Sequence, residues 1–175
     1  MLQPEIKVGI FYASTTGHTE EIAHRIAQFL GRSASLHDIA REGVAALPQY
    51  RYLILGIPTW DFGQKQENWA EHWAELEVMD FHQVKVVLFG LGDQIGYGEW
   101  FVDALADLAD LLQVRGAELL VPWSVEGYSF EASRALTEDG QHFVGLALDQ
   151  DCQAAETDER LHTWLSRVCH AFQAG

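Results

Sequence analysis

Several features that define other classes of protein are missing from this sequence. Only two of its 175 residues are cysteines, Cys152 and Cys169, so we expect two free thiols, no disulfide framework and no metal site. No apolar run reaches the roughly 18 residues that a transmembrane helix requires. The first 12 residues also lack the charged-then-apolar order of a signal peptide. We therefore expect a cytoplasmic protein without a membrane partner.

Positive charge is scarce as well. The chain has 11 lysines and arginines against 26 acidic residues, which gives a formal net charge of −15. Nucleic acids and anionic membrane surfaces would repel such a protein, whereas a partner with a basic face would be attracted to it. The length fits a single domain, residues 1–175, with its own hydrophobic core.

Segments with strand and helix patterns alternate along the chain, without a linker or a repeat. Runs such as 50–59 and 84–90 are apolar on both faces, which is typical of strands inside a parallel sheet. The predicted strands lie at about 5–12, 35–39, 50–59, 84–90 and, in two parts, 117–123 and 142–148. The predicted helices lie at about 17–30, 67–76 and 99–115, and from Thr157 as N-cap.

This order predicts an α/β fold in which helices cover both faces of a five-stranded parallel sheet. A polar stretch at 124–140 interrupts the last strand, so we expect an insertion that splits it. The helices should bury apolar stripes that include Phe29 in the first helix and Trp100 in the third. Ligands of such sheets bind beyond the carboxyl ends of the strands, at the loops after the first, third and fourth strands.

The loop after the first strand, ASTTGHTEE at 13–21, combines hydroxyls with a glycine at the start of a helix. Helix N-termini favour anions, and Gly17 lets the backbone approach a ligand closely. The spacing of a Walker loop and its lysine are both missing, so a single phosphate held by neutral donors is the better fit. The alternative is a helix with redundant caps. The hydroxyls are those of Ser14, Thr15, Thr16 and Thr19.

The loops at 56–63 and 90–101 each carry one large aromatic residue, Trp60 and Tyr97, at the same edge of the predicted sheet. Aromatic side chains in exposed loops gain little unless a flat partner stacks on them. Two such residues facing each other would form a slot for a planar ring system. The alternative is that each folds back onto the core.

These three loops resemble those of a long-chain flavodoxin. The phosphate loop is ASTTGHT, the second loop PTWDFG and the third GLGDQIGY, while WSVEGYSFE and FVGLALDQDCQ resemble the family's insertion and the strand after it. The resemblance covers about residues 6–170. It implies a flavodoxin-like three-layer sandwich with strand order 2-1-3-4-5 and FMN bound where the strand order reverses.

The resemblance also implies which residues contact FMN. Trp60 and Tyr97 would enclose the isoalloxazine, and the Asp61–Phe62 or Phe62–Gly63 peptide would turn so that its carbonyl accepts a hydrogen bond from N5 of the reduced flavin. Two residues depart from the family pattern: His18 replaces a common lysine, and Trp100 replaces a smaller polar residue. His18 either places a cation beside the phosphate or faces solvent. The full implied set is Ser14, Thr15, Thr16, Gly17, His18, Thr19, Pro58, Thr59, Trp60, Asp61, Phe62, Gly63, Leu91, Gly92, Asp93, Tyr97, Trp100 and Asp151.

A flavodoxin is an electron carrier without catalytic residues of its own. The resemblance implies a monomer that shuttles single electrons through the semiquinone/hydroquinone couple of FMN. Its donor would be an NAD(P)H-dependent flavodoxin/ferredoxin reductase, and its acceptors redox enzymes with basic docking faces. A carboxylate about 10 Å from the flavin disfavours an extra negative charge by roughly 1.7 kcal/mol at an effective dielectric of about 20. That energy corresponds to a one-electron potential about 70 mV lower.

Two other functions are compatible with parts of the pattern. An FMN-dependent quinone reductase has the same fold and cofactor but usually completes its substrate pocket as an oligomer. A phosphorelay receiver domain is also doubly wound and acidic, yet it needs an aspartate at the end of the third strand, where this chain has GIPT. The sequence identifies neither the physiological donor nor the acceptor.

Overall fold

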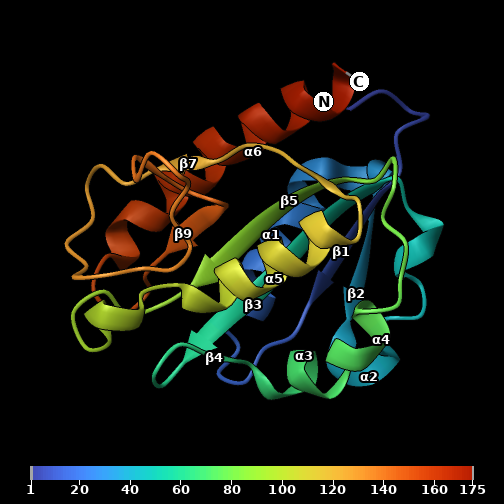
Figure 1. Ribbon diagram of the computed structural model, residues 1–175. Coiled ribbons are helices and arrows are strands. Elements are labelled where there is room, and N and C mark those ends of the chain that lie inside the picture. The colour runs from blue at the N-terminus through green and yellow to red at the C-terminus, as the bar shows by residue number, and fades with distance from the viewer. Residues whose placement is uncertain (1, 175) are drawn as a thin grey trace.

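A computed structural model describes residues 2–174 and shows a parallel sheet with helices on both faces (Figure 1). The strands run in the order β2-β1-β3-β5-β6, which is the predicted order 2-1-3-4-5. β3 lies in the middle of this order, as its apolar sequence predicted. The bounds are β1 Val8–Tyr12, β2 Ala34–Asp38, β3 Tyr52–Trp60, β5 Lys85–Leu91 and β6 Glu118–Leu119.

The fifth strand is split, as the polar insertion predicted. β6 pairs with the first residues of β5, and β9, Leu146–Leu148, pairs in parallel with Phe89, Gly90 and Leu91 farther along β5. Between them the chain forms a small hairpin of β7, Trp123–Ser124, and β8, His142–Phe143. Both halves thus extend one sheet while the insertion lies outside it, near α6 (Figure 1).

The helices differ from the predictions mainly at their ends. The helix expected at 67–76 is two short helices, and the one expected at 99–115 begins only at Asp103 because Gly98–Trp100 is a 3-10 turn. Thr157 is the first residue of the last helix rather than its N-cap, and its hydroxyl donates to Gln150 Oε1 at 2.7 Å. The helices are α1 His18–Leu30, α2 Ile39–Glu42, α3 Glu67–Glu71, α4 Trp73–Leu76, α5 Asp103–Val114 and α6 Thr157–Gln173.

The two faces of the sheet are covered by different helices. α1 and α6 lie behind the sheet in Figure 1, and α5 lies in front of it. Arg25 of α1 forms an ion pair with Asp158 of α6 at 2.6 Å, so these two helices are neighbours. Phe29 was expected in the core but is 44% exposed, because its ring lies against His162 of α6 at the helix–helix boundary.

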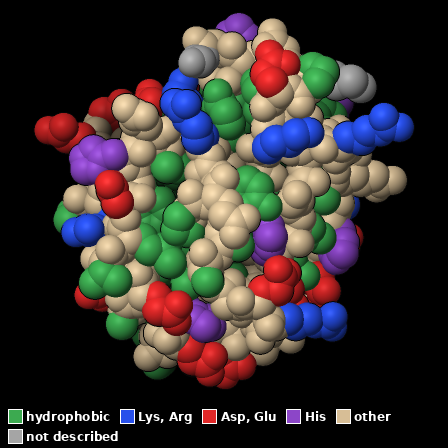
Figure 2. Space-filling model, turned by 90° about the vertical axis from the view of Figure 1, so that its right-hand side faces the viewer, with side chains coloured by type: hydrophobic (Ala, Val, Ile, Leu, Met, Phe, Trp, Pro, Cys, Tyr) green, Lys and Arg blue, Asp and Glu red, His purple; other side chains and the backbone are tan. Residues whose placement is uncertain are grey.

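Side chains of both charges lie where the strands start: Glu5 precedes β1 and Glu118 begins β6. Lys7 precedes β1, Arg51 precedes β3 and Lys85 begins β5, so basic side chains lie where the strands start. Figure 2 shows this side of the molecule, where Lys and Arg side chains lie among Asp and Glu side chains. None of the helices within residues 2–174 is long and apolar enough to cross a membrane.

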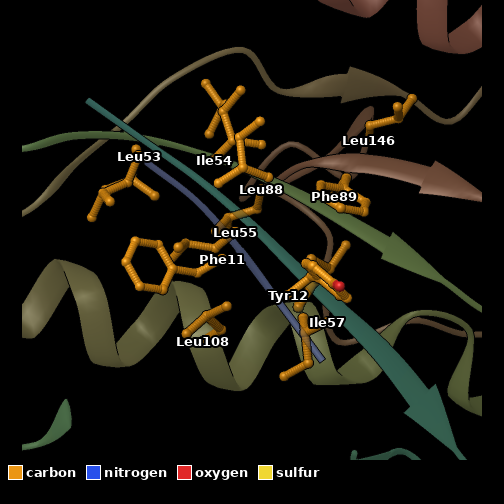
Figure 3. Packing of buried hydrophobic residues seen from close by; sticks show 14 of the residues in the cluster. Phe11, Tyr12, Leu53, Ile54, Leu55, Ile57, Leu88, Phe89, Leu108 and Leu146 are labelled. Atoms are coloured by element: carbon orange, nitrogen blue, oxygen red, sulfur yellow. The ribbon is translucent and has the colours of Figure 1, made fainter. Parts of the chain in front are cut away.

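The core is continuous from the first strand to the last helix. Phe11 of β1 and Leu53 and Leu55 of β3 pack over Leu108 of α5 (Figure 3). Phe89 of β5 lies on the side of the core nearer to Leu146 of β9. Trp69 of α3 is fully buried and donates its indole N–H to the carbonyl of Gly56 at 2.9 Å. This packing holds the carboxyl ends of β1, β3, β5 and β9 in place, and a loop extends from each of them.

Candidate functional site

The loops after β1, β3, β5 and β9 meet at the carboxyl edge of the sheet and enclose a pocket, called the rim pocket below. Twelve of the eighteen residues expected from the resemblance line it, so the three loops converge as predicted. A thirteenth lining residue, Gln150, was not predicted. The rim pocket is lined by Thr16, His18, Thr19, Thr59, Trp60, Asp61, Leu91, Gly92, Asp93, Tyr97, Trp100, Gln150 and Asp151.

The N-terminus of α1 opens toward the rim pocket without a side-chain cap. Gly17 precedes the helix at φ 93°, a left-handed conformation that favours glycine, and a Cβ there would meet nothing within 4 Å. Gly17 is therefore required for its left-handed backbone conformation, and not because a side chain there would clash with a neighbour. Among the described residues, no group accepts a hydrogen bond from the main-chain N–H of His18, Thr19 or Glu20. These donors suit an anion.

The four hydroxyls of the first loop have different surroundings. Thr16 and Thr19 line the rim pocket, whereas Ser14 and Thr15 do not. Ser14 Oγ accepts a hydrogen bond from Gly17 N at 3.0 Å and so stabilises the turn. Thr15 Oγ1 accepts one from Gln66 Nε2 at 3.3 Å, which ties the first loop to the start of α3. Two hydroxyls thus face the pocket and two support the loop.

Trp60, the last residue of β3, and Tyr97, in the third loop, both line the rim pocket. Tyr97 is 43% exposed, and its main-chain N–H donates to the carbonyl of Asp93 at 3.0 Å. The indole Nε1 of Trp60 is buried, and no described residue accepts its hydrogen bond. A buried donor without a partner is costly, and its position beside a pocket is consistent with a ligand acceptor.

The second loop is a three-residue turn between β3 and β4, Gln64–Lys65. Asp61 and Gly63 have φ values of 45° and 87°, and a Cβ on Gly63 would lie 2.9 Å from Asp103 Oδ2. Phe62 is 68% exposed and packs edge-on against Trp100, with ring centroids 4.9 Å apart. Pro58, Phe62 and Gly63 do not line the rim pocket.

The third loop is held by the side chain of Asp93. Its Oδ1 accepts hydrogen bonds from Ile95 N at 3.0 Å and Gly96 N at 2.7 Å, which closes a tight turn before Tyr97. Gly92 at the end of β5 donates its main-chain N–H to the carbonyl of Leu148 at 3.0 Å. The third loop is therefore attached to β9 as well as to β5.

Residues after β9 complete the pocket. Gln150 and Asp151 both line it, and Gln150 is held by the Thr157 hydroxyl. Nothing in the residue type of Gln150 distinguishes it from other polar loop residues, so the only sequence signal was its position beside Asp151. The buried residues Gln94 and Asp149, which join these loops, were also missed.

Cys152 is exposed and follows the pocket residue Asp151. Its thiol donates to Asp93 Oδ1 at 3.3 Å. Desolvation, this hydrogen bond and the charge of Asp149 raise the pKa of Cys152 to about 11, so the thiol is protonated at neutral pH. The second cysteine, Cys169, is buried in α6, and desolvation also raises its pKa. Both are free thiols, as predicted.

The chain is similar in sequence and in structure to known proteins. The family model described as flavodoxin matches residues 10–164. Flavodoxin 2 of Salmonella typhi is 44% identical over 164 residues, covering 93% of this chain and 95% of that protein. Flavodoxin 1 of Escherichia coli K12 is 45% identical over 161 residues, covering 91% of both.

A solved structure shows the same architecture. The crystal structure of Fusobacterium nucleatum flavodoxin bound to flavin mononucleotide superimposes with a TM-score of 0.89 at 32% identity, covering 95% of this chain and 98% of that one. The structures of flavodoxin 1 and flavodoxin 2 from Bacillus cereus have TM-scores of 0.69 and 0.70.

Proposed function

Because the chain belongs to the flavodoxin family and is an electron carrier that uses FMN, we propose that its rim pocket holds this cofactor. Bound FMN supplies a redox centre that takes up and releases one electron at a time. The single observation that carries the assignment of the site is the meeting of an uncapped helix N-terminus with Trp60 and Tyr97 in one pocket.

We propose that the phosphate of FMN binds at the start of α1. The free main-chain N–H groups of His18 and Thr19, together with the hydroxyls of Thr16 and Thr19, supply neutral donors there. The helix dipole adds a partial positive charge. His18 is exposed at this point and lines the pocket, so it can add a positive charge when it is protonated. Ser14, Thr15 and Gly17 keep the loop in shape.

The flavin ring would lie between Trp60 and Tyr97. Both side chains line the rim pocket, and neither is fully buried, so each has surface to offer a planar ligand. Gly92 lets the third loop pack closely on the buried residues behind it, since a Cβ there would lie 3.1 Å from the Phe101 ring and 3.2 Å from Val102. Pro58 and Phe62 then act as support for the second loop.

Low potential is expected from the charge around the pocket. Asp61, Asp93 and Asp151 all line it, and His18 is the one side chain among the described lining residues that can carry a positive charge. Carboxylates at such short range disfavour adding further negative charge to a bound group. The formal charge of −15 acts in the same direction, although salt screens its exposed part.

The carrier exchanges electrons with redox partners, as its family does. We propose that the donor is an NAD(P)H-dependent reductase and that partners approach the rim pocket with a basic face. The acidic lining of the pocket, with Asp61, Asp93 and Asp151, would orient this approach. We further propose that residues 1–175 form one domain and act as a monomer.

The proposed approach predicts a salt-dependent rate of electron transfer. Stopped-flow measurement of electron transfer from a flavodoxin reductase should show a second-order rate constant that falls at least about tenfold as ionic strength rises from 10 mM to 500 mM, because screening removes the steering. Neutral sucrose at matched viscosity serves as the control. A rate constant that does not change with salt would show that the acidic pocket does not steer the partner.

A further inference from the structure

A buried carboxylate connects the loops of the rim pocket. Asp149 follows β9 directly and is 0% exposed, although it does not line the pocket itself. Its Oδ2 accepts hydrogen bonds from the main-chain N–H of Gln94 at 2.9 Å and from Gln94 Nε2 at 2.8 Å. Its Oδ1 accepts the main-chain N–H groups of Asp151 at 3.1 Å and Cys152 at 2.9 Å. One side chain therefore holds the third loop and the loop after β9.

Gln94 extends this connection to the insertion. Its side chain is also buried, and its Oε1 accepts the main-chain N–H of Ser129 at 2.5 Å. The same stretch of the insertion is bonded to the third loop again, since the carbonyl of Gly98 accepts the N–H groups of Glu131 and Ala132 at 2.8 and 2.9 Å. Tyr97 lies between these two attachments. The Asp149–Gln94 pair thus connects three segments that are separate in the sequence.

The Asp149–Gln94 pair holds a carboxylate away from solvent. Among the described residues, no Lys, Arg or His forms an ion pair with Asp149, so a fully buried charge is balanced only by four N–H donors. Burying a carboxylate is expensive, and a neutral side chain could connect two loops at lower cost. A carboxylate, however, offers two acceptor oxygens and so can hold two donors from each loop at once.

We propose that Asp149 and Gln94 are positioning residues for the cofactor, which fix Asp93 and Tyr97 on one side of the rim pocket and Gln150 and Asp151 on another. This inference rests on the proposed binding of FMN in that pocket. The two residues act through their neighbours, because neither lines the pocket. The insertion takes part in the same arrangement through Ser129, so it contributes to the flavin site from a distance.

The test uses Asp149→Asn and Gln94→Ala in the full-length protein. Asparagine offers one oxygen in place of two, so two of the four N–H donors lose their acceptor. We expect the Kd for FMN to rise at least about tenfold in Asp149→Asn. In Gln94→Ala, which keeps the charge, we expect a rise of at least about threefold. Asp158→Asn is the matched control, since it removes the same charge from a side chain that is 86% exposed.

The visible circular dichroism of the bound flavin distinguishes a change in the position of the cofactor from a loss of protein stability. At saturating FMN, both variants should change the visible circular dichroism of the bound flavin, and the Asp158→Asn control should not. Unchanged circular dichroism and a Kd within twofold of the parent in Gln94→Ala would overturn the inference, even if Asp149→Asn fails to fold. If the parent protein itself bound no FMN, the proposed function would fail instead, and the two failures are thus distinguishable.

Discussion

Replacing Trp60 by alanine is expected to weaken FMN binding by roughly 5- to 150-fold, because stacking of a planar ring on an aromatic side chain is worth about 1–3 kcal/mol. Trp60 lines the rim pocket opposite the third loop, and its indole Nε1 is a buried donor without a protein acceptor. Its indole ring offers a face on which a flavin can stack. Titration of the apoprotein with FMN, followed by quenching of flavin fluorescence, measures the effect.

Removal of Trp60 should also raise the lower of the two reduction potentials, because water then reaches the ring and screens the negative charge of the pocket. The matched control is Phe29→Ala, which removes another partly exposed aromatic ring that lies against α6, away from the pocket. Its Kd for FMN should stay within twofold of the parent value. An unchanged Kd in Trp60→Ala would contradict the assigned ring site.

Gly145→Ala is expected to destabilise the protein by about 1–3 kcal/mol, the usual cost of forcing an extra carbon into a packed site. A Cβ at Gly145 would lie 2.4 Å from the carbonyl oxygen of Leu88. Leu88 is a fully buried residue of the central sheet, so its backbone cannot move aside without disturbing β5. Urea denaturation of the apoprotein measures the loss of stability.

The matched control for this change is Gly98→Ala, where the nearest atom to a new Cβ is Glu131 N at 3.5 Å, an ordinary contact. Its stability should change by about 0.5 kcal/mol or less. Gly145→Ala should also weaken FMN binding, because Gly145 directly precedes β9, and the carbonyl of Leu148 at the end of β9 accepts the N–H of Gly92 at the pocket. A parent-like urea midpoint in Gly145→Ala would show that β9 is not packed against β5 as described.

The sheet could be predicted from the sequence because its strands are buried on both faces. The runs at 50–59 and 84–90 are too apolar to be exposed, and they form the two neighbouring strands β3 and β5. The split of the fifth strand was also predictable, since a polar insertion stands between two short apolar runs. β6 and β9 pair with different parts of β5, as this pattern required.

Helix ends were predicted less well because tertiary contacts determine them. Trp100 continues the apolar pattern of α5 but lies in a 3-10 turn, Gly98–Trp100. Val102, between this turn and α5, has φ 49°, a conformation rare for a branched side chain. The carbonyl of Ala132, in the insertion, accepts the N–H of Phe101 there at 3.2 Å. Phe29 continues the buried stripe of α1 in sequence, yet it falls at the boundary with α6 and remains partly exposed.

The site was predictable where residue type carries a signal. Hydroxyls beside Gly17, and Trp60 and Tyr97 in exposed loops, are unusual enough to indicate ligand chemistry from sequence. Gln150, Gln94 and Asp149 are not, because a glutamine or an aspartate in a loop is ordinary until its burial and partners are known. The local sequence also could not separate the pocket-lining hydroxyls of Thr16 and Thr19 from the supporting ones.

The central claim is that the rim pocket binds FMN through both its ring and its phosphate, and paired titrations of the apoprotein with FMN and riboflavin test it most directly. We predict a 1:1 complex with FMN and at least about 100-fold weaker binding of riboflavin. Riboflavin lacks the charged group that at least two donors at α1 would bind, and each such bond contributes about 1.5–3 kcal/mol. Equal affinities would contradict the phosphate site at α1, and no binding of either flavin would contradict the whole account.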